Sequence, residues 1–228
     1  MDSFIINYGL LFLGLIITVA ADIYVNSSYS KYKKVQSKSG LTGFEVARKI
    51  LDENGLNDID IVSVKGELSD HYDPRRKVVR LSEPVFNGTS ISSVSVAAHE
   101  VGHAIQDKEN YSFMRIRAML VPVVNFSSKL GYFAIFLGFI FNFLDLALFG
   151  IILLLAMLLF QLVTLPVEFD ASKRAKMQLA DLAILDSEEV PKSSNMLRAA
   201  AFTYVASLVT TLLEILRLVL VVFNNRER

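Results

Sequence analysis

Long apolar segments alternate with mixed polar ones along the chain. Apolar side chains dominate residues 4–25, most of 118–166 and 199–223, whereas 31–117 has the charge content of a water-facing domain. An α-helix rises about 1.5 Å per residue, so about 20 apolar residues cross the roughly 30 Å hydrocarbon layer of a bilayer. The pattern therefore predicts a mainly α membrane protein with about four transmembrane helices and one small α+β module.

The first apolar run, residues 4–25, has two interpretations. Its Val-Ala-Ala at 19–21 resembles a signal-peptide cleavage site, but the positive cluster at 31–34 follows the run. Signal peptides carry their positive charge before the apolar core. We therefore expect residues 1–30 to be a retained transmembrane anchor.

Charge around the anchor also predicts its orientation. Basic residues close to a transmembrane end tend to remain cytoplasmic, and Lys31, Lys33 and Lys34 follow the anchor directly. We expect a multi-pass protein of the cell membrane whose module, residues 31–117, faces the cytoplasm. An outside amino terminus and four crossings would leave the carboxyl terminus outside as well.

The module has the periodicities of both helices and strands. The predicted elements are a helix at 42–53, strands at 59–64 and 77–81, and a helix through 94–104 that Ser90 or Ser92 can cap. The strand at 77–81 is either an edge at which a peptide could pair or an internal strand. These elements define an α+β module that ends near residue 117.

The segment that follows the module is almost entirely apolar. Residues 118–166 have one polar break in their second half, near Asn142 and Asp145. Their length fits two transmembrane helices joined by a short turn. We therefore predict a transmembrane hairpin.

The remaining chain is predicted to return to the module and then cross the membrane again. Residues 167–198 are expected to form a helix and loop, with a loop-like tract at 186–195, and 199–228 the last transmembrane helix and its tail. Glu214 and Arg217 are three positions apart in that last helix. They can therefore pair on one helix face.

The amino-acid composition limits the classes of binding partner and of metal ligand that can be expected. The 228 residues carry 23 Lys and Arg against 23 Asp and Glu, and without a dense basic block no nucleic-acid partner is expected. Cysteine is absent, which excludes disulfides, thiolate metal ligands and a cysteine nucleophile. A hydrophobic fraction of 53% points instead to the lipid bilayer.

The chemistry is concentrated in the helix expected at 94–104. His99-Glu100-Val101-Gly102-His103 fits the pattern H-E-x-x-H, which uses two of the three histidines of the chain. Residues four apart share one helix face, so both imidazoles can bind one zinc ion at about 2.0–2.1 Å. Glu100 is predicted to be the general base that takes a proton from a zinc-bound water.

A catalytic zinc usually has three protein ligands and one open position. The third ligand must lie on the same membrane side as His99, and the hairpin returns the chain to that side just after Pro166. The first carboxylates there are Glu168 and Asp170. Either can complete the site.

Three sequence blocks resemble a known family. They are A-A-H-E-V-G-H-A-I-Q at 97–106, L-S-D-H-Y-D-P-R-R-K-V-V-R-L-S at 68–82 and L-P-V-E-F-D-A-S-K-R-A at 165–175. They look like the YugP-type neutral zinc metallopeptidases of bacterial membranes. The resemblance extends over nearly the whole chain and implies a single catalytic zinc ion, Zn²⁺, and a polypeptide substrate.

That family resembles, more distantly, the membrane gluzincins, in which a glutamate of an E-F-x-A-D type helix completes the zinc site. The resemblance implies that Glu168 is the third ligand. The aspartate place of that motif is Ser172 here, so a carboxylate that would orient a zinc-bound histidine is missing. Asp170 is a weaker candidate for that work.

The third histidine, His71, lies in the turn-rich stretch 69–74. It is either an exposed loop residue or a group that stabilises the oxyanion or binds substrate, with third-ligand duty less favoured than for Glu168. Tyr72 and Tyr111 are alternative phenolic donors. The sequence does not choose among them.

The combined pattern predicts a membrane-embedded, zinc-dependent endopeptidase. Its motif lies shortly before an apolar run, which favours membrane or membrane-adjacent polypeptides as substrates. A catalytically silent metal-binding scaffold is the alternative, although such a protein would be expected to lose Glu100 or a ligand. A metal transporter is disfavoured because its site would lie at the bilayer midplane.

Overall fold

The computed structural model describes residues 2–226 of the chain, and these form two compact units. The helical unit consists of Met1–Asp22, Arg115–Leu165 and Thr203–Arg228. The mixed unit consists of Ile23–Met114 and Pro166–Phe202. Each unit gathers segments that are distant in the sequence.

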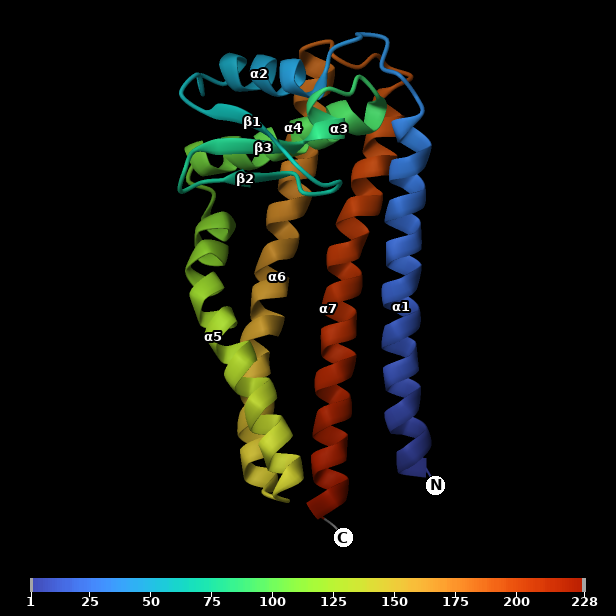
Figure 1. Cartoon of the computed structure of the whole chain (residues 1–228), viewed down its shortest axis with the longest axis vertical. Helices are drawn as coiled ribbons and strands as arrows, with labels where there is room; N and C mark the ends of the chain where they lie inside the picture. The colour runs from blue at the N-terminus through green and yellow to red at the C-terminus, as the bar shows by residue number, and fades with distance from the viewer. Residues whose placement is uncertain (1, 227–228) are drawn as a thin grey trace. The chain divides into compact units, whose positions relative to one another are not determined.

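The helical unit is built from parts of four long helices, which Figure 1 shows as extended coils. They are α1 (Asp2–Lys33), α5 (Ser112–Ile140), α6 (Leu144–Asp181) and α7 (Val190–Arg226). All four are long and apolar enough to cross a membrane, judged on described residues. The predicted fold class is therefore confirmed, with helices that extend further than their apolar runs.

Close packing in the helical unit depends on small residues of α5 and α6. A Cβ added at Gly150 would lie 2.5 Å from the Gly131 carbonyl oxygen, and one added at Gly138 would lie 2.6 Å from the Ala147 nitrogen. Small residues let helix backbones approach closely in lipid, where dispersion drives association. The predicted break between the two helices is a short turn at residues 141–143.

The mixed unit contains three short helices and a small sheet. Its elements, besides the ends of the long helices, are α2 (Gly43–Glu53), β1 (Asp60–Val64), β2 (His71–Asp73), β3 (Val78–Ser82), α3 (Glu83–Phe86) and α4 (Ile91–Lys108). The helix α2 begins with a capping box, in which Thr42 Oγ1 accepts from the Glu45 N–H at 3.2 Å. The two predicted strands and two predicted helices are present.

The sheet has the order β1-β3-β2, with β1 parallel and β2 antiparallel to β3. Within the turn-rich stretch at 69–74, where the sequence predicts no strand, His71–Asp73 forms the strand β2. It was missed because three residues with one buried side chain give no alternation to detect. The strand β3 is internal, so the alternative of a peptide-pairing edge at 77–81 is wrong.

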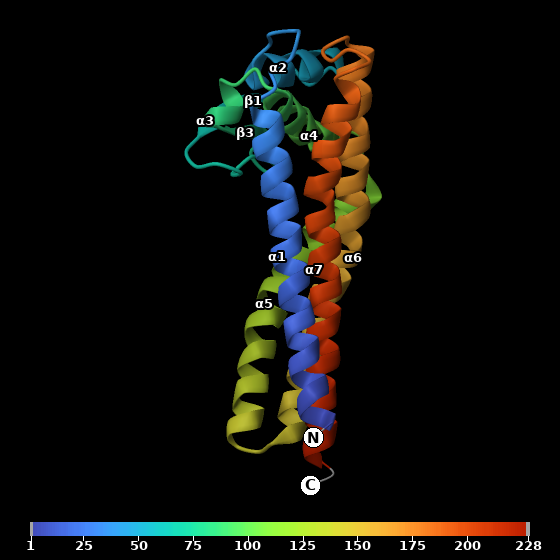
Figure 2. The same ribbon diagram turned by 90° about the vertical axis from the view of Figure 1, so that its right-hand side faces the viewer.

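The core of the mixed unit lies between the sheet and its helices. The helix α4 lies behind the sheet in Figure 1 and on one side of it in Figure 2. Val46 and Ile50 of α2, Leu81 of β3 and Val94 and Val101 of α4 are all completely buried. The nonpolar face of α4 is therefore fixed inside the unit.

The expected loop at 186–195 is shorter in the structure. The helix α7 begins at Val190, and Pro191 is its second residue. Proline is tolerated in a first helical turn because the N–H it lacks has no partner there. The buried Glu189 fixes the preceding loop by accepting from the Lys38 N–H at 2.8 Å.

Candidate metal site

The helix α4 presents the motif on one face. Ser90, rather than Ser92, is its N-cap and accepts from the Ser93 N–H at 3.2 Å. The helix is continuous through the motif, so His99 and His103 are one turn apart. Their rings meet edge to face, with centroids 4.8 Å apart.

The helix α6 passes close to α4 at Gly102. A Cβ on Gly102 would lie 2.7 Å from the Ala171 carbonyl oxygen, closer than non-bonded atoms tolerate. The backbone of α6 therefore occupies the space that any larger residue at position 102 would fill. This approach brings Glu168, one turn before Ala171, to the motif.

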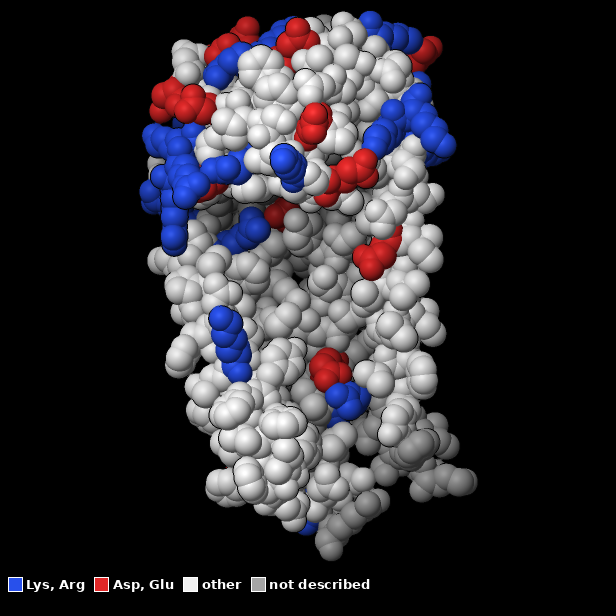
Figure 3. Space-filling model, viewed as in Figure 1, with Lys and Arg blue, Asp and Glu red and all other residues white. Residues whose placement is uncertain are grey.

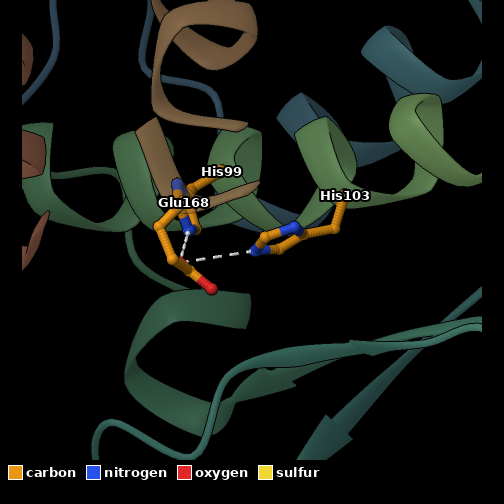
Figure 4. Close-up of side chains that lie close together, drawn as sticks. All are labelled: His99, His103 and Glu168. Atoms are coloured by element: carbon orange, nitrogen blue, oxygen red, sulfur yellow. Dashed lines mark hydrogen bonds and ion pairs between the residues drawn. The ribbon is translucent and has the colours of Figure 1, made fainter. Parts of the chain in front are cut away.

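Three side chains converge between these helices, as Figure 4 shows. Glu168 Oε2 lies 3.3 Å from His99 Nε2 and 3.7 Å from His103 Nε2. Two ligands 2.0–2.1 Å from a tetrahedral zinc lie about 3.4 Å apart. The donor atoms of all three residues fall within 4.8 Å of one another, so the set fits a single ion.

The other ring nitrogens are held by polar neighbours. Gln106 Oε1 lies 3.0 Å from His103 Nδ1, and Ser172 Oγ lies 3.2 Å from His99 Nδ1. Because an amide oxygen only accepts, it fixes the proton of His103 on Nδ1 and leaves Nε2 for a metal. Ser172 contacts His99 at the position where the sequence indicated that an orienting carboxylate is missing, so a hydroxyl lies there instead.

Asp170 is not one of the three converging residues. Its Oδ2 accepts from Gln106 Nε2 at 2.9 Å and from Arg174 Nε at 2.5 Å. Gln106 Nε2 also donates to the Val167 carbonyl oxygen at 2.8 Å. Asp170 thus supports His103 through Gln106, and this amide ties α4 to α6.

Glu100 follows His99 on α4, is buried, and interacts electrostatically with all three converging residues. Its side chain is 8% exposed, and no described residue donates a hydrogen bond to its carboxylate. Burial raises the pKa of Glu100, an effect opposed by His99 and His103 and reinforced by the negative charges of Glu168 and Asp70. A carboxylate of raised pKa is a stronger proton acceptor than an ordinary glutamate.

The structure does not bring the remaining candidates into this cluster. His71 is exposed in β2, where its Nδ1 contacts the Ser69 carbonyl oxygen at 2.9 Å. The Tyr72 hydroxyl donates to Asp107 Oδ2 at 2.9 Å, and the Tyr111 ring packs on Phe113. Burial and this hydrogen bond raise the pKa of Tyr72.

Comparison with known proteins identifies the class of this site. The family model described as "Putative neutral zinc metallopeptidase" matches residues 7–223. The chain therefore belongs to this family, and the family implies zinc as the metal.

One curated relative extends the match. The chain is 48% identical over 207 residues to "Putative membrane protease YugP" of Bacillus subtilis (strain 168), which covers 91% of this chain and 92% of that protein. No solved structure matches. The resemblance of the three sequence blocks to this family is confirmed.

Proposed function

We propose that this protein is a membrane-embedded, zinc-dependent endopeptidase that cleaves membrane or membrane-adjacent polypeptides. The convergence of His99, His103 and Glu168 beside the buried Glu100 carries this proposal. The family and its membrane protease relative support a protease-type function, and the four apolar helices support a multi-pass protein of the cell membrane.

The proposed zinc ligands are His99 Nε2, His103 Nε2 and one oxygen of Glu168. Three ligands leave a tetrahedral ion one open position, as catalytic zinc sites require. A zinc ion held by these residues would supply an acidified water and would polarise the scissile carbonyl. The hydrogen bonds of His103 Nδ1 with Gln106 and of His99 Nδ1 with Ser172 hold both rings so that their Nε2 atoms would face the ion.

Glu100 is the proposed general base. Its carboxylate takes the proton from the attacking water and passes it to the leaving amine. No described residue donates a hydrogen bond to the Glu100 carboxylate, so both of its oxygens can accept a hydrogen bond from the water. His71, exposed in β2, is proposed to contact substrate rather than metal.

The positive residues at the end of the first helix favour a cytoplasmic mixed unit. Lys31 and Lys33 end α1, and Lys34 follows directly. The polypeptide substrate would then be cleaved at the cytoplasmic side of the membrane. Access of a protease to the mixed unit in right-side-out and inverted vesicles tests this orientation.

Peptide cleavage by Glu100→Gln tests the mechanism. The purified full chain should contain one zinc ion and cleave a peptide library, whereas Glu100→Gln should retain zinc and cleave about 100- to 10,000-fold more slowly. The matched control is Glu53→Gln, at an exposed residue of α2. Unchanged cleavage by Glu100→Gln would refute the general-base role.

Zinc content distinguishes the two carboxylates of α6. Glu168→Ala should lose zinc because it removes a ligand, whereas Asp170→Ala should retain measurable zinc at lower affinity. Both are measured by mass spectrometry of metal in purified protein. Loss of zinc from Asp170→Ala, with zinc retained in Glu168→Ala, would make Asp170 the third ligand instead. Bound zinc without peptide cleavage in the wild type would favour the catalytically silent scaffold.

A further inference from the structure

A cavity of about 520 Å³ opens on the sheet of the mixed unit, apart from the three converging residues. Its lining consists of Val64, Ser69, His71, Asp73, Arg75, Arg76 and Arg80. Three guanidinium groups thus face one carboxylate. Figure 3 shows Lys and Arg side chains gathered over the turn between β2 and β3.

The positive charge of this cavity is only partly neutralised. Asp73 Oδ1 accepts the backbone N–H groups of Arg75 at 3.0 Å and Arg76 at 3.2 Å, and its Oδ2 lies 4.0 Å from Arg76 Nε. Among the described residues, no carboxylate lies within 4.0 Å of the Arg75 or Arg80 guanidinium. Arg80 is half-buried and lines the cavity, so its charge is less exposed to bulk solvent than those of Arg75 and Arg76.

The position of β2 relates this cavity to α4. The strand β2 pairs with β3 on one side only and is an edge of the sheet. It packs against α4, where the Tyr72 hydroxyl is bonded to Asp107. In the strand register, His71 lies opposite Arg80; the edge strand β2 contributes His71 and Asp73 to the cavity, and β3 contributes Arg80.

We propose that this cavity is a subsite for an acidic side chain of the polypeptide substrate. The inference rests on the proposed endopeptidase function and specifies its substrate class. A guanidinium group offers a planar fork that matches a carboxylate, and such charge-assisted hydrogen bonds are about twice as strong as neutral ones. An extended peptide lying along β2 would present alternate side chains to this face.

Binding to a chain that does not cleave separates recognition from catalysis. In the zinc-loaded Glu100→Gln background, fluorescence anisotropy is measured with three decapeptides that differ at one position, which is Glu, Gln or Lys. The Glu peptide should bind about tenfold more tightly than the Gln peptide, since a charged hydrogen bond is worth about that factor. The Lys peptide should bind most weakly, and the preference should fall with salt.

Two variants identify the residues responsible. Arg80→Gln and the exposed turn variant Arg75→Gln should each reduce the preference for Glu over Gln, while binding of the Gln peptide stays within about twofold. Lys34→Gln, at an exposed cation outside the cavity, is the matched control. Thermal melting shows whether Arg80→Gln is folded. If Arg80→Gln misfolds, the exposed Arg75→Gln variant alone tests the proposal.

The outcomes are distinct. Equal binding of the Glu and Gln peptides, or an equal effect of Lys34→Gln, would overturn the subsite. Displacement of the Glu peptide by glycerol phosphate as effectively as by an acetylated glutamyl peptide would assign the cavity to an anionic lipid headgroup instead. If wild type cleaves the Gln and Glu peptides equally, the subsite proposal fails while the endopeptidase proposal stands. If wild type binds the Glu peptide preferentially but cleaves none of the peptides, the endopeptidase proposal fails while the anion-binding cavity stands.

Discussion

The two units of this chain use hydrophobic residues in opposite ways. In the helical unit, large apolar side chains point outward, such as Phe136 at 60% exposure and Leu212 at 53%. In the mixed unit, Ile50 and Leu81 are completely buried. The difference indicates that each unit is built for a different solvent, with lipid tails around one and water around the other.

Charged residues follow the same division. In the apolar part of α7, Arg217 donates to both oxygens of Glu214, at 2.8 and 2.6 Å, as predicted from their spacing. An isolated charge has a large unfavourable free energy in hydrocarbon, and pairing with an opposite charge lowers it. In the mixed unit, by contrast, Arg75 is exposed without an ion pair among the described residues. Water solvates such a charge.

Two leucines of nearly equal exposure offer the strongest test of this comparison. Leu212→Lys should destabilise insertion of α7 by about 3 kcal/mol, because lysine near a helix centre is costly in lipid. Leu68→Lys, at 54% exposure in the mixed unit, should change stability by less than about 0.5 kcal/mol. The membrane-integrated fraction and melting temperature measure both. Equal losses would show that the units share one solvent.

Gly102→Ala tests the close approach of α4 and α6. The added methyl group would meet the Ala171 carbonyl oxygen, so we expect a loss of about 1–3 kcal/mol and weaker zinc binding. The matched control is Gly9→Ala in α1, where no atom lies within 4 Å of the new Cβ. Calorimetry and zinc titration provide the two readouts. A neutral Gly102→Ala would mean that α6 is free to move.

Gln106→Leu tests the support of His103. Leucine fills the space but removes the hydrogen bonds to His103, Asp170 and the Val167 carbonyl oxygen. Loss of an orienting partner typically weakens metal binding about 10- to 100-fold. Competition with a chromophoric chelator measures the zinc affinity. The control Gln36→Leu, at an exposed residue, should leave the zinc affinity unchanged. An unchanged zinc affinity in Gln106→Leu would show that the Gln106 amide does not support the site.

Lys77→Gly is expected to have the smallest effect. Lys77 has a φ of 48°, in the left-handed region that costs an L-residue about 1 kcal/mol. Glycine should therefore raise the free energy of unfolding by less than about 1 kcal/mol. Gly40→Ala, at a φ of 65° with open space around it, should lower that free energy by a similar amount. Chemical denaturation measures both.

Much of the site was predictable from local spacing. Residues four apart on a helix share a face, so the spacing of His99 and His103 is enough to place their imidazoles together. Glu168 followed from the return of the chain after the hairpin and from the family resemblance. These inferences depend on chain order and helix geometry.

The supporting contacts were not predictable in the same way. Gln106 is three residues after His103 on α4, a spacing that could have marked it, but its bond to Asp170 requires the actual approach of α6. The contact of Ser172 with His99 also requires the approach of α6, and the sequence indicated only that a carboxylate is missing at position 172. The strand β2 was missed because tertiary pairing with β3, rather than its own pattern, makes it a strand.

The origin of the three converging residues has a consequence for biogenesis. Glu168 is 69 positions beyond His99, and the intervening chain contains all of α5 and the first two thirds of α6. A nascent chain that has emerged only as far as α4 therefore carries two imidazoles and no carboxylate partner from α6. The three residues proposed as zinc ligands can therefore come together only after synthesis has passed α5 and most of α6.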